Sequence, residues 1–166
     1  MVEPWLRGTL TEVDAVPRGV LHALELARED VARWTAGLSD EELEARPFGL
    51  PSAGFQMRHI VRSLDRLLTY AEGRQLGEEQ LAALKSEMEH SDSRADLFVE
   101  FERGIDTAMT RLRAIAPESF AEARGGGRKM LPTTVGGLLV HSADHTQRHV
   151  GQLVTTAKVV IAMREE

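Results

Sequence analysis

The sequence predicts an all-α fold, a four-helix bundle with short additional helices in the connections. Four long segments repeat apolar residues at spacings of three and four, which is the period of an amphipathic helix. No segment sustains the period-two alternation and β-branched enrichment that are typical of a strand. With 166 residues, no internal repeat and no interdomain linker, the chain predicts a single domain over residues 1–166 with one sizeable core.

The composition narrows the classes of function. The net charge of -6 argues against a nucleic-acid partner, which would need a basic surface. Because the chain contains no cysteine, a metal site has to use imidazole, carboxylate and water, and thiol chemistry needs a thiol from a cosubstrate. No apolar run reaches the length of about 18 residues that predicts a membrane span, and the acidic N-terminal stretch lacks the apolar core of a secretory signal. We therefore expect a cytoplasmic protein that binds neither nucleic acid nor a membrane.

The first long helix is predicted from Pro17, a residue that suits a first helical turn, to about Gly37. His22 lies off its apolar stripe, so we expect this histidine at the surface. Ser39 then begins a capping box, in which a hydroxyl and a carboxylate three residues later satisfy free amides at a helix start. The helix that it starts is predicted to be short because Pro47 ends it.

The second long helix covers residues 53–72. His59 lies off the core stripe of this helix, on a second face that also carries Phe55, Ser63, Arg66 and Tyr70. Two interpretations remain open, an exposed histidine or a histidine presented to a cleft, and the spacing alone does not separate them. Residues 73–89 predict a short helix of weak amphipathicity, inserted between the main helices, after which His90 is expected in solvent.

Asp92 or Ser93 is predicted to cap the third long helix, which ends near Ala116 before Pro117. Residues 118–132 predict a loop, whose glycine-rich part we interpret as a flexible turn at the mouth of a site. This segment lacks the spacing of a phosphate-binding loop and follows no strand, so a phosphate site is disfavoured.

The fourth long helix is predicted from a Thr133 cap to about Met163. Gly136 and Gly137 lie in its first turns, where each glycine costs about 1 kcal/mol of helix propensity relative to alanine. Close approach of a neighbouring helix or loop is one reason for a chain to keep them.

Half of the six histidines lie within nine residues of this helix, at His141, His145 and His149. Residues four apart are separated by about 6 Å along the axis and share one face, so two imidazoles at this spacing can bind one metal ion. All three cannot easily do so, because the outer two are about 12 Å apart in rise and metal–nitrogen bonds are about 2 Å long.

The helical wheel chooses between the two possible pairs. The predicted buried stripe consists of Val135, Leu139, Ser142, Leu153, Ala157 and Val160. His149 falls inside this stripe, His145 lies at its edge, and His141 is rotated toward the side that carries Asp144 and Arg148. An inward ligand pair is therefore His145 and His149. The competing interpretation is a row of helix-face histidines that hydrogen-bond to their neighbours.

Two stretches resemble signatures of the DinB/YfiT superfamily. Phe55-Gln56-Met57-Arg58-His59-Ile60, continuing through Leu67-Leu68-Thr69-Tyr70, resembles the second-helix motif of that family. Residues 141–152, in which a paired histidine runs into x-Gly-Gln, resemble its fourth-helix motif. The order of the predicted elements matches as well, so the resemblance covers nearly the whole chain.

This resemblance implies a four-helix bundle that binds a divalent metal, commonly nickel or zinc, through three histidines. One comes from the second helix and two come from the fourth, which are His59, His145 and His149 in this sequence. The resemblance thus places His59 at the cleft and leaves His141 as a cleft residue or a support for the ligands. Many members of the family are dimers, and those of known activity are largely metal-dependent transferases or isomerases that use low-molecular-weight thiols.

We therefore expect a metal-dependent transferase or hydrolase that acts on a small molecule, with a low-molecular-weight thiol as a possible cosubstrate, and a homodimer. Three neutral imidazoles leave coordination positions open, as in catalytic metal sites. The sequence identifies no catalytic residue. Its weak candidates for positioning a substrate are Tyr70, Arg66 and residues 124–128, and Gln152 is a candidate support for His149. The alternative is a non-catalytic metal-binding or oligomeric scaffold.

Overall fold

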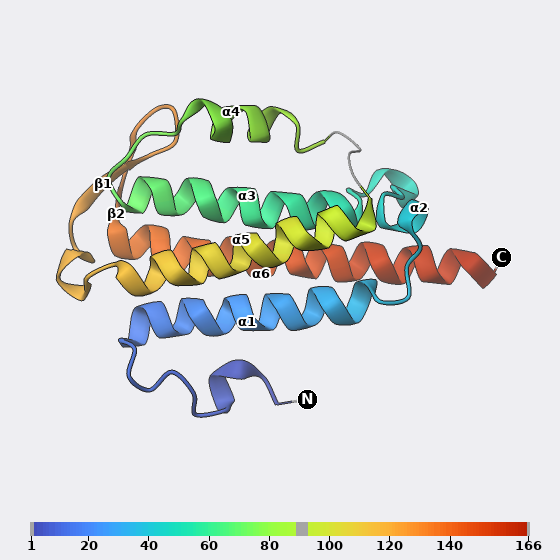
Figure 1. The fold of residues 1–166 in the computed structure, drawn as a ribbon, viewed down its shortest axis with the longest axis horizontal. Helices are drawn as coiled ribbons and strands as arrows, with labels where there is room; N and C mark the ends of the chain where they lie inside the picture. Colours follow the sequence, from blue (N-terminus) through green and yellow to red (C-terminus); the bar gives the residue numbers. More distant parts are fainter. Residues whose placement is uncertain (1, 89–92, 166) are drawn as a thin grey trace.

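The computed structural model describes residues 2–88 and 93–165 (Figure 1). Its four long helices pack side by side, with α6 against α1 and α3, and with α3 also against α5. These helices are α1 (Ala15–Thr35), α3 (Ala53–Ala71), α5 (Arg94–Ala114) and α6 (Val135–Ala162). The predicted mainly α-helical four-helix fold is therefore confirmed.

Shorter elements fill the connections. They are α2 (Asp40–Leu43), α4 (Glu78–Lys85) and the 3-10 turns η1 (Pro4–Leu6), η2 (Pro47–Gly49), η3 (Pro117–Ser119) and η4 (Met163–Glu165). The capping box predicted at Ser39 is present, because its hydroxyl accepts from the Glu42 amide and its own amide donates to the Glu42 carboxylate at 2.7 Å. Ser93 caps α5, accepting from the amide of Asp96.

The direction of the helices explains α4. In Figure 1, α1 and α6 run one way along the bundle, and α3 and α5 run the other way. Two parallel helices that follow one another need a connection that returns the chain along their length. The weakly amphipathic helix predicted over residues 73–89 belongs to this return: α4 lies along the outer side of α3, and none of its residues is buried.

The prediction of a surface position for His22 is wrong. This side chain is 7% exposed, and its Nε2 lies 3.3 Å from the hydroxyl of Thr9. The N-terminal segment folds back along α1, where Arg7 pairs with Glu29. The N-terminal segment thereby covers a second face of α1. A helical wheel of α1 shows only the face that packs in the bundle core and does not reveal this cover.

The loop predicted over residues 118–132 contains a β-hairpin, so the expectation of no strand is also wrong. β1 (Ala123–Gly126) pairs with β2 (Leu131–Thr134) in antiparallel register, with Ala123 opposite Thr134. Strands of four residues, one of them rich in glycine, are too short to show a period-two pattern. Because β2 extends through Thr134, the cap of α6 is Thr134 and not the predicted Thr133.

The predicted close approach of a loop explains the glycine at position 136, in the first turn of α6. The amide of Gly136 donates to the Phe120 carbonyl at 2.9 Å, and a Cβ added at Gly136 would lie 3.1 Å from that oxygen. The loop before the hairpin therefore approaches the helix backbone closely. The predictions for His90 and for Asp92 lie outside the described residues.

We predict that Gly104→Ala destabilises the bundle although alanine favours a helix. A Cβ at Gly104 of α5 would lie 2.4 Å from Cβ of Val61 on α3, so the two helices would have to separate. Overpacking of this kind costs about 1–3 kcal/mol in the free energy of unfolding, which urea titration measures.

Gly19→Ala in α1 is the matched control, because no heavy atom lies within 4 Å of an added Cβ there. That variant should gain up to about 1 kcal/mol from helix propensity. Equal stability of the two variants would contradict the close packing of α3 on α5.

Candidate metal centre

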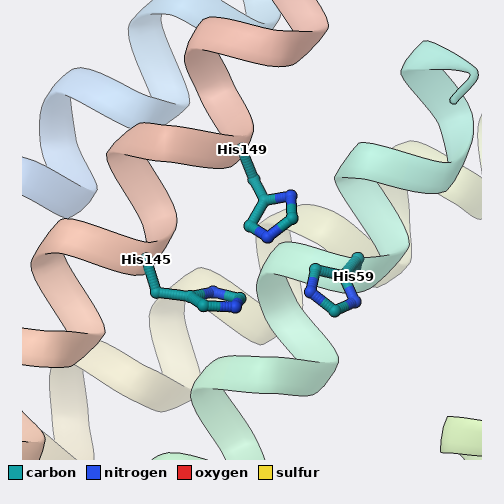
Figure 2. Close-up of side chains that lie close together, drawn as sticks. All are labelled: His59, His145 and His149. Carbon is teal, nitrogen blue, oxygen red and sulfur yellow. The ribbon is translucent and has the colours of Figure 1, made fainter. Parts of the chain in front are cut away.

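Packing of α3 against α6 brings the three predicted ligands together. Ser52 caps α3 by accepting from the amide of Phe55 at 3.0 Å, and the buried stripe of Met57, Ile60 and Leu64 fixes the rotation of that helix. His59 then lies on the side that faces α6. Figure 2 shows its ring pointing toward those of His145 and His149, which project from successive turns of α6.

The three rings lie close enough to share one ion. The ring centroids of His59 and His149 are 4.3 Å apart, those of His145 and His149 are 4.4 Å apart, and those of His59 and His145 are 5.1 Å apart. One nitrogen from each ring lies within 4.8 Å of the others. All six residues of the predicted α6 stripe are buried, so the rotation that the wheel assigned to this helix is correct.

The orientation of His149 is fixed by a buried amide on the facing helix. Gln56, fully buried on α3, places its Oε1 2.6 Å from Nδ1 of His149 and donates through Nε2 to Oε1 of Gln152 at 2.9 Å. Since a carbonyl oxygen only accepts, Nδ1 carries the proton and Nε2 keeps its lone pair for a metal. Gln152, the predicted support, thus acts on His149 through Gln56.

A buried carboxylate orients His59 in the same way. Oε2 of Glu87 lies 2.7 Å from Nδ1 of His59, and its other oxygen accepts from Arg66. Burial opposes ionisation of Glu87, but the hydrogen bonds from His59 and Arg66 outweigh it, so the pKa of this carboxyl is lowered. The ionised carboxylate holds the Nδ1 proton, and Nε2, which lies 3.3 Å from the Ser63 hydroxyl, is the nitrogen left to bind a metal.

Burial and mutual repulsion keep the two α6 histidines neutral. Desolvation and then the neighbouring His149, His59 and His141 lower the pKa of His145 to about 4. Desolvation, His59 and Arg148 likewise lower the pKa of His149 to about 4, against the opposing charge of Glu87. Neutral imidazoles are the form that binds a metal, so no proton has to leave these two rings at neutral pH.

A pocket of about 830 Å³ opens beside the histidines. Its lining comes from α3, the α4 crossover, the hairpin turn and α6, and it consists of His59, Ser63, Arg66, Leu67, Tyr70, Gln75, Leu76, Leu81, Leu84, Lys85, Gly127, Arg128, His141 and His145. The glycine-rich turn therefore lies at the mouth of the site, as predicted. Tyr70 and Arg66 also line the pocket, whereas Arg124 instead donates to the Ala71 carbonyl at the end of α3.

A comparison with known protein families finds a match for this chain. The family model of the DinB superfamily matches residues 23–153. The chain belongs to the DinB superfamily. The resemblance seen in the two motifs is thus confirmed, and the matched range includes all three histidines. No curated protein matches the sequence.

Other polar residues of this DinB protein lie outside the cluster. The His141 ring is 5.5 Å from that of His145 and lines the pocket, but its side chain is 46% exposed and it is not part of the three-nitrogen group. Asp144 pairs with Arg148 at 2.6 Å on the exposed side of α6, where neither reaches the ligands. In the part of the chain that the structure describes, no helix has the length and apolar character needed to cross a membrane.

Two supporting residues of this DinB site escaped the sequence analysis. Glu87 reaches His59 only because the α4 crossover returns along α3, and nothing local in its segment indicates that position. Gln56 lies within the family-like stretch, one turn before His59, but its contact to His149 depends on the pairing of α3 with α6. A polar residue inside an apolar stripe was the only available signal for Gln56.

We predict that the metal-free DinB protein loses stability as the pH falls from about 6.5 toward about 4. The pKa values of His145 and His149 are near 4 in the fold against an ordinary 6.5, so the unfolded chain binds more protons within this window. Urea unfolding in the presence of EDTA at pH 7 and pH 5 measures the difference.

The decrease should be smaller for His145→Gln, which removes one of the two shifted groups and part of the repulsion on the other. A wild-type free energy of unfolding that is equal at both pH values would contradict the burial of these rings. So would an equal decrease in wild type and variant.

Proposed function

We propose that this protein binds one divalent metal ion, nickel or zinc, through His59, His145 and His149 and is a metal-dependent transferase or hydrolase for a small molecule. The observation that carries the proposal is the convergence of three imidazoles, two of them oriented by hydrogen bonds, beside a pocket. A low-molecular-weight thiol is the proposed cosubstrate, since the chain offers no cysteine of its own.

The donor set fits such an ion. Nitrogens bound at about 2.1 Å in a tetrahedral arrangement lie about 3.4 Å from one another, and the three here lie within 4.8 Å, so small side-chain rotations are sufficient. Imidazole ligands suit nickel and zinc. The Nδ1 positions of His59 and His149 are already occupied by Glu87 and Gln56, which is the support that metal-binding histidines usually have.

When bound, the ion would supply an acidified water or hold a cosubstrate thiol as thiolate. The chain itself supplies the walls and the orientation. Three protein ligands leave coordination positions open, and the pocket meets His59 and His145 on one side. The Tyr70 hydroxyl, which forms no hydrogen bond with any described residue, is available to position a substrate.

The pocket favours an enzyme over the alternative of a non-catalytic scaffold. A structural metal site is closed by its ligands and needs no adjoining cavity. Here a volume of about 830 Å³, large enough for a small molecule, opens directly onto two of the three histidines. The homodimer and the cytoplasmic location remain predictions. Trp5 and Leu6, exposed at 60% and 59% on the N-terminal segment, are the surface that we propose for the dimer contact.

We predict about one nickel or zinc ion per chain in protein purified without a histidine tag, measured by elemental analysis. His59→Ala, His145→Ala and His149→Ala should each lose this ion, because two imidazoles hold it far more weakly than three. The helical circular dichroism of each variant should persist, since none of the three side chains belongs to the apolar core.

His141→Ala is the matched control on the same helix and should keep about one ion. Full metal occupancy in the His149→Ala variant would reject the ligand set. Absence of metal in wild type, before and after dialysis against nickel or zinc, would reject the metal-dependent function altogether.

We further predict that Gln56→Leu lowers the affinity for the ion about 10–100-fold without changing the stoichiometry. The leucine removes the acceptor that holds the Nδ1 proton of His149. Competition with a chelator measures the affinity. Gln75→Leu, which changes a pocket residue whose amide donates to the sulfur of Met130, should bind the ion as wild type does. Equal affinities for both variants would contradict the role of Gln56.

A further inference from the structure

We propose that the pocket beside the histidines selects an organic acid, an anion with an apolar body, over neutral and cationic molecules of the same shape. The proposal names the substrate class of the proposed enzyme. That the bound acid is a substrate rests on the proposed function. That the pocket prefers an anion rests on the pocket lining alone.

The charge of the lining is opposite to that of the whole chain. Acidic residues outnumber basic ones by 26 to 20 in the sequence, yet none of the described residues that line this pocket is acidic. Its cationic side chains are Arg66, Lys85 and Arg128. The charge of Arg66 is balanced by its ion pair with Glu87, which leaves two cations for a ligand.

The two remaining cations, Lys85 and Arg128, are exposed. Within the described ranges, neither Lys85 nor Arg128 forms an ion pair, whereas arginines on the neighbouring surface of α3 do, as Arg62 does with Glu100 at 2.7 Å. Two cations in one pocket whose described lining has no acidic residue favour an anion from outside.

The two cations lie toward different parts of the pocket. Lys85 ends α4, two residues before the Glu87 that binds His59, so it belongs to the side near the histidines. Arg128 lies in the hairpin turn, and the same hairpin is bound to the C-terminal end of α3 through Arg124 and Ala71. Along α3 the lining extends from His59 to Tyr70, about 16 Å of helix rise. We place the carboxylate at Arg128, with Lys85 adding positive charge nearer the histidines.

The pocket also has apolar walls. Four leucines line it: Leu67, Leu76, Leu81 and Leu84. Leu81 and Leu84 are 45% and 44% exposed on α4, a helix that buries none of its own residues. Leucines that face a pocket and remain this exposed are covered when an apolar ligand enters, which favours an acid with a hydrocarbon or aromatic body.

Isothermal titration calorimetry with octanoate, octanamide and octylamine tests the proposal. It is run on nickel-loaded protein and on EDTA-treated protein, with the metal content of each sample measured. We expect octanoate to bind at least tenfold more tightly than octanamide in both samples, and octylamine to bind most weakly. The double variant Lys85→Gln/Arg128→Gln should lose that tenfold preference while its affinity for octanamide stays the same.

Arg103→Gln is the matched control, since Arg103 is an exposed arginine of α5 that lines a different cavity, against α3 and α4. It should bind all three compounds as wild type does. Equal binding of octanoate and octanamide by metal-loaded wild type would overturn the inference and leave the metal centre intact. A preference that survives in the double variant would also overturn it, because the carboxylate would then be binding elsewhere, for example to the ion. Charge-dependent binding by a chain that takes up no nickel during loading would reject the metal centre and support the inference.

Discussion

The antiparallel contact between α3 and α6 is the constraint on which the candidate site depends. His59 lies on one helix and His145 and His149 lie on the other, so the three nitrogens converge only at one register of the pair. The buried amide of Gln56 sits in this contact, hydrogen-bonded to His149 and to Gln152. A slip by one helical turn would separate the rings and leave that amide without partners, which is costly in a core. The same polar group thus favours the register and orients a ligand.

The crossover between α3 and α5 builds the other half of the site. Because these two helices are parallel, the chain has to travel back along the bundle, and it does so along the outer side of α3 (Figure 1). This return segment brings Glu87 to His59 and places Leu76, Leu81 and Leu84 in the lining of the pocket. Topology, and not local helix propensity, therefore accounts for a helix as weakly amphipathic as α4.

The electrostatic surroundings keep two of the three imidazoles neutral, which is the form that can bind a metal ion. Desolvation and mutual repulsion lower the pKa of His145 and His149 to about 4, so both rings are neutral at pH 7 and each keeps one nitrogen lone pair. The ionised carboxylate of Glu87 pairs with Arg66 and lies against Nδ1 of His59, so its negative charge is close to the cluster. Each of the three histidines then offers one nitrogen lone pair. None of the described residues that line the adjoining pocket is acidic. The proposed metal centre and the proposed anion pocket therefore share one cavity.

The sequence by itself determined the long helices, the capping box at Ser39, the buried stripe of α6 and the inward pair His145 and His149. All of these follow from local periodicity, since residues on one helix have fixed relative positions. His59 needed the family motif, because its face of α3 is defined only by what packs there. Tertiary structure alone decided the burial of His22, the hairpin before α6, and the roles of Gln56 and Glu87. The hairpin strands are too short to show a pattern, and the other three features depend on segments separated in sequence, whose alignment is set by the packing of the whole bundle.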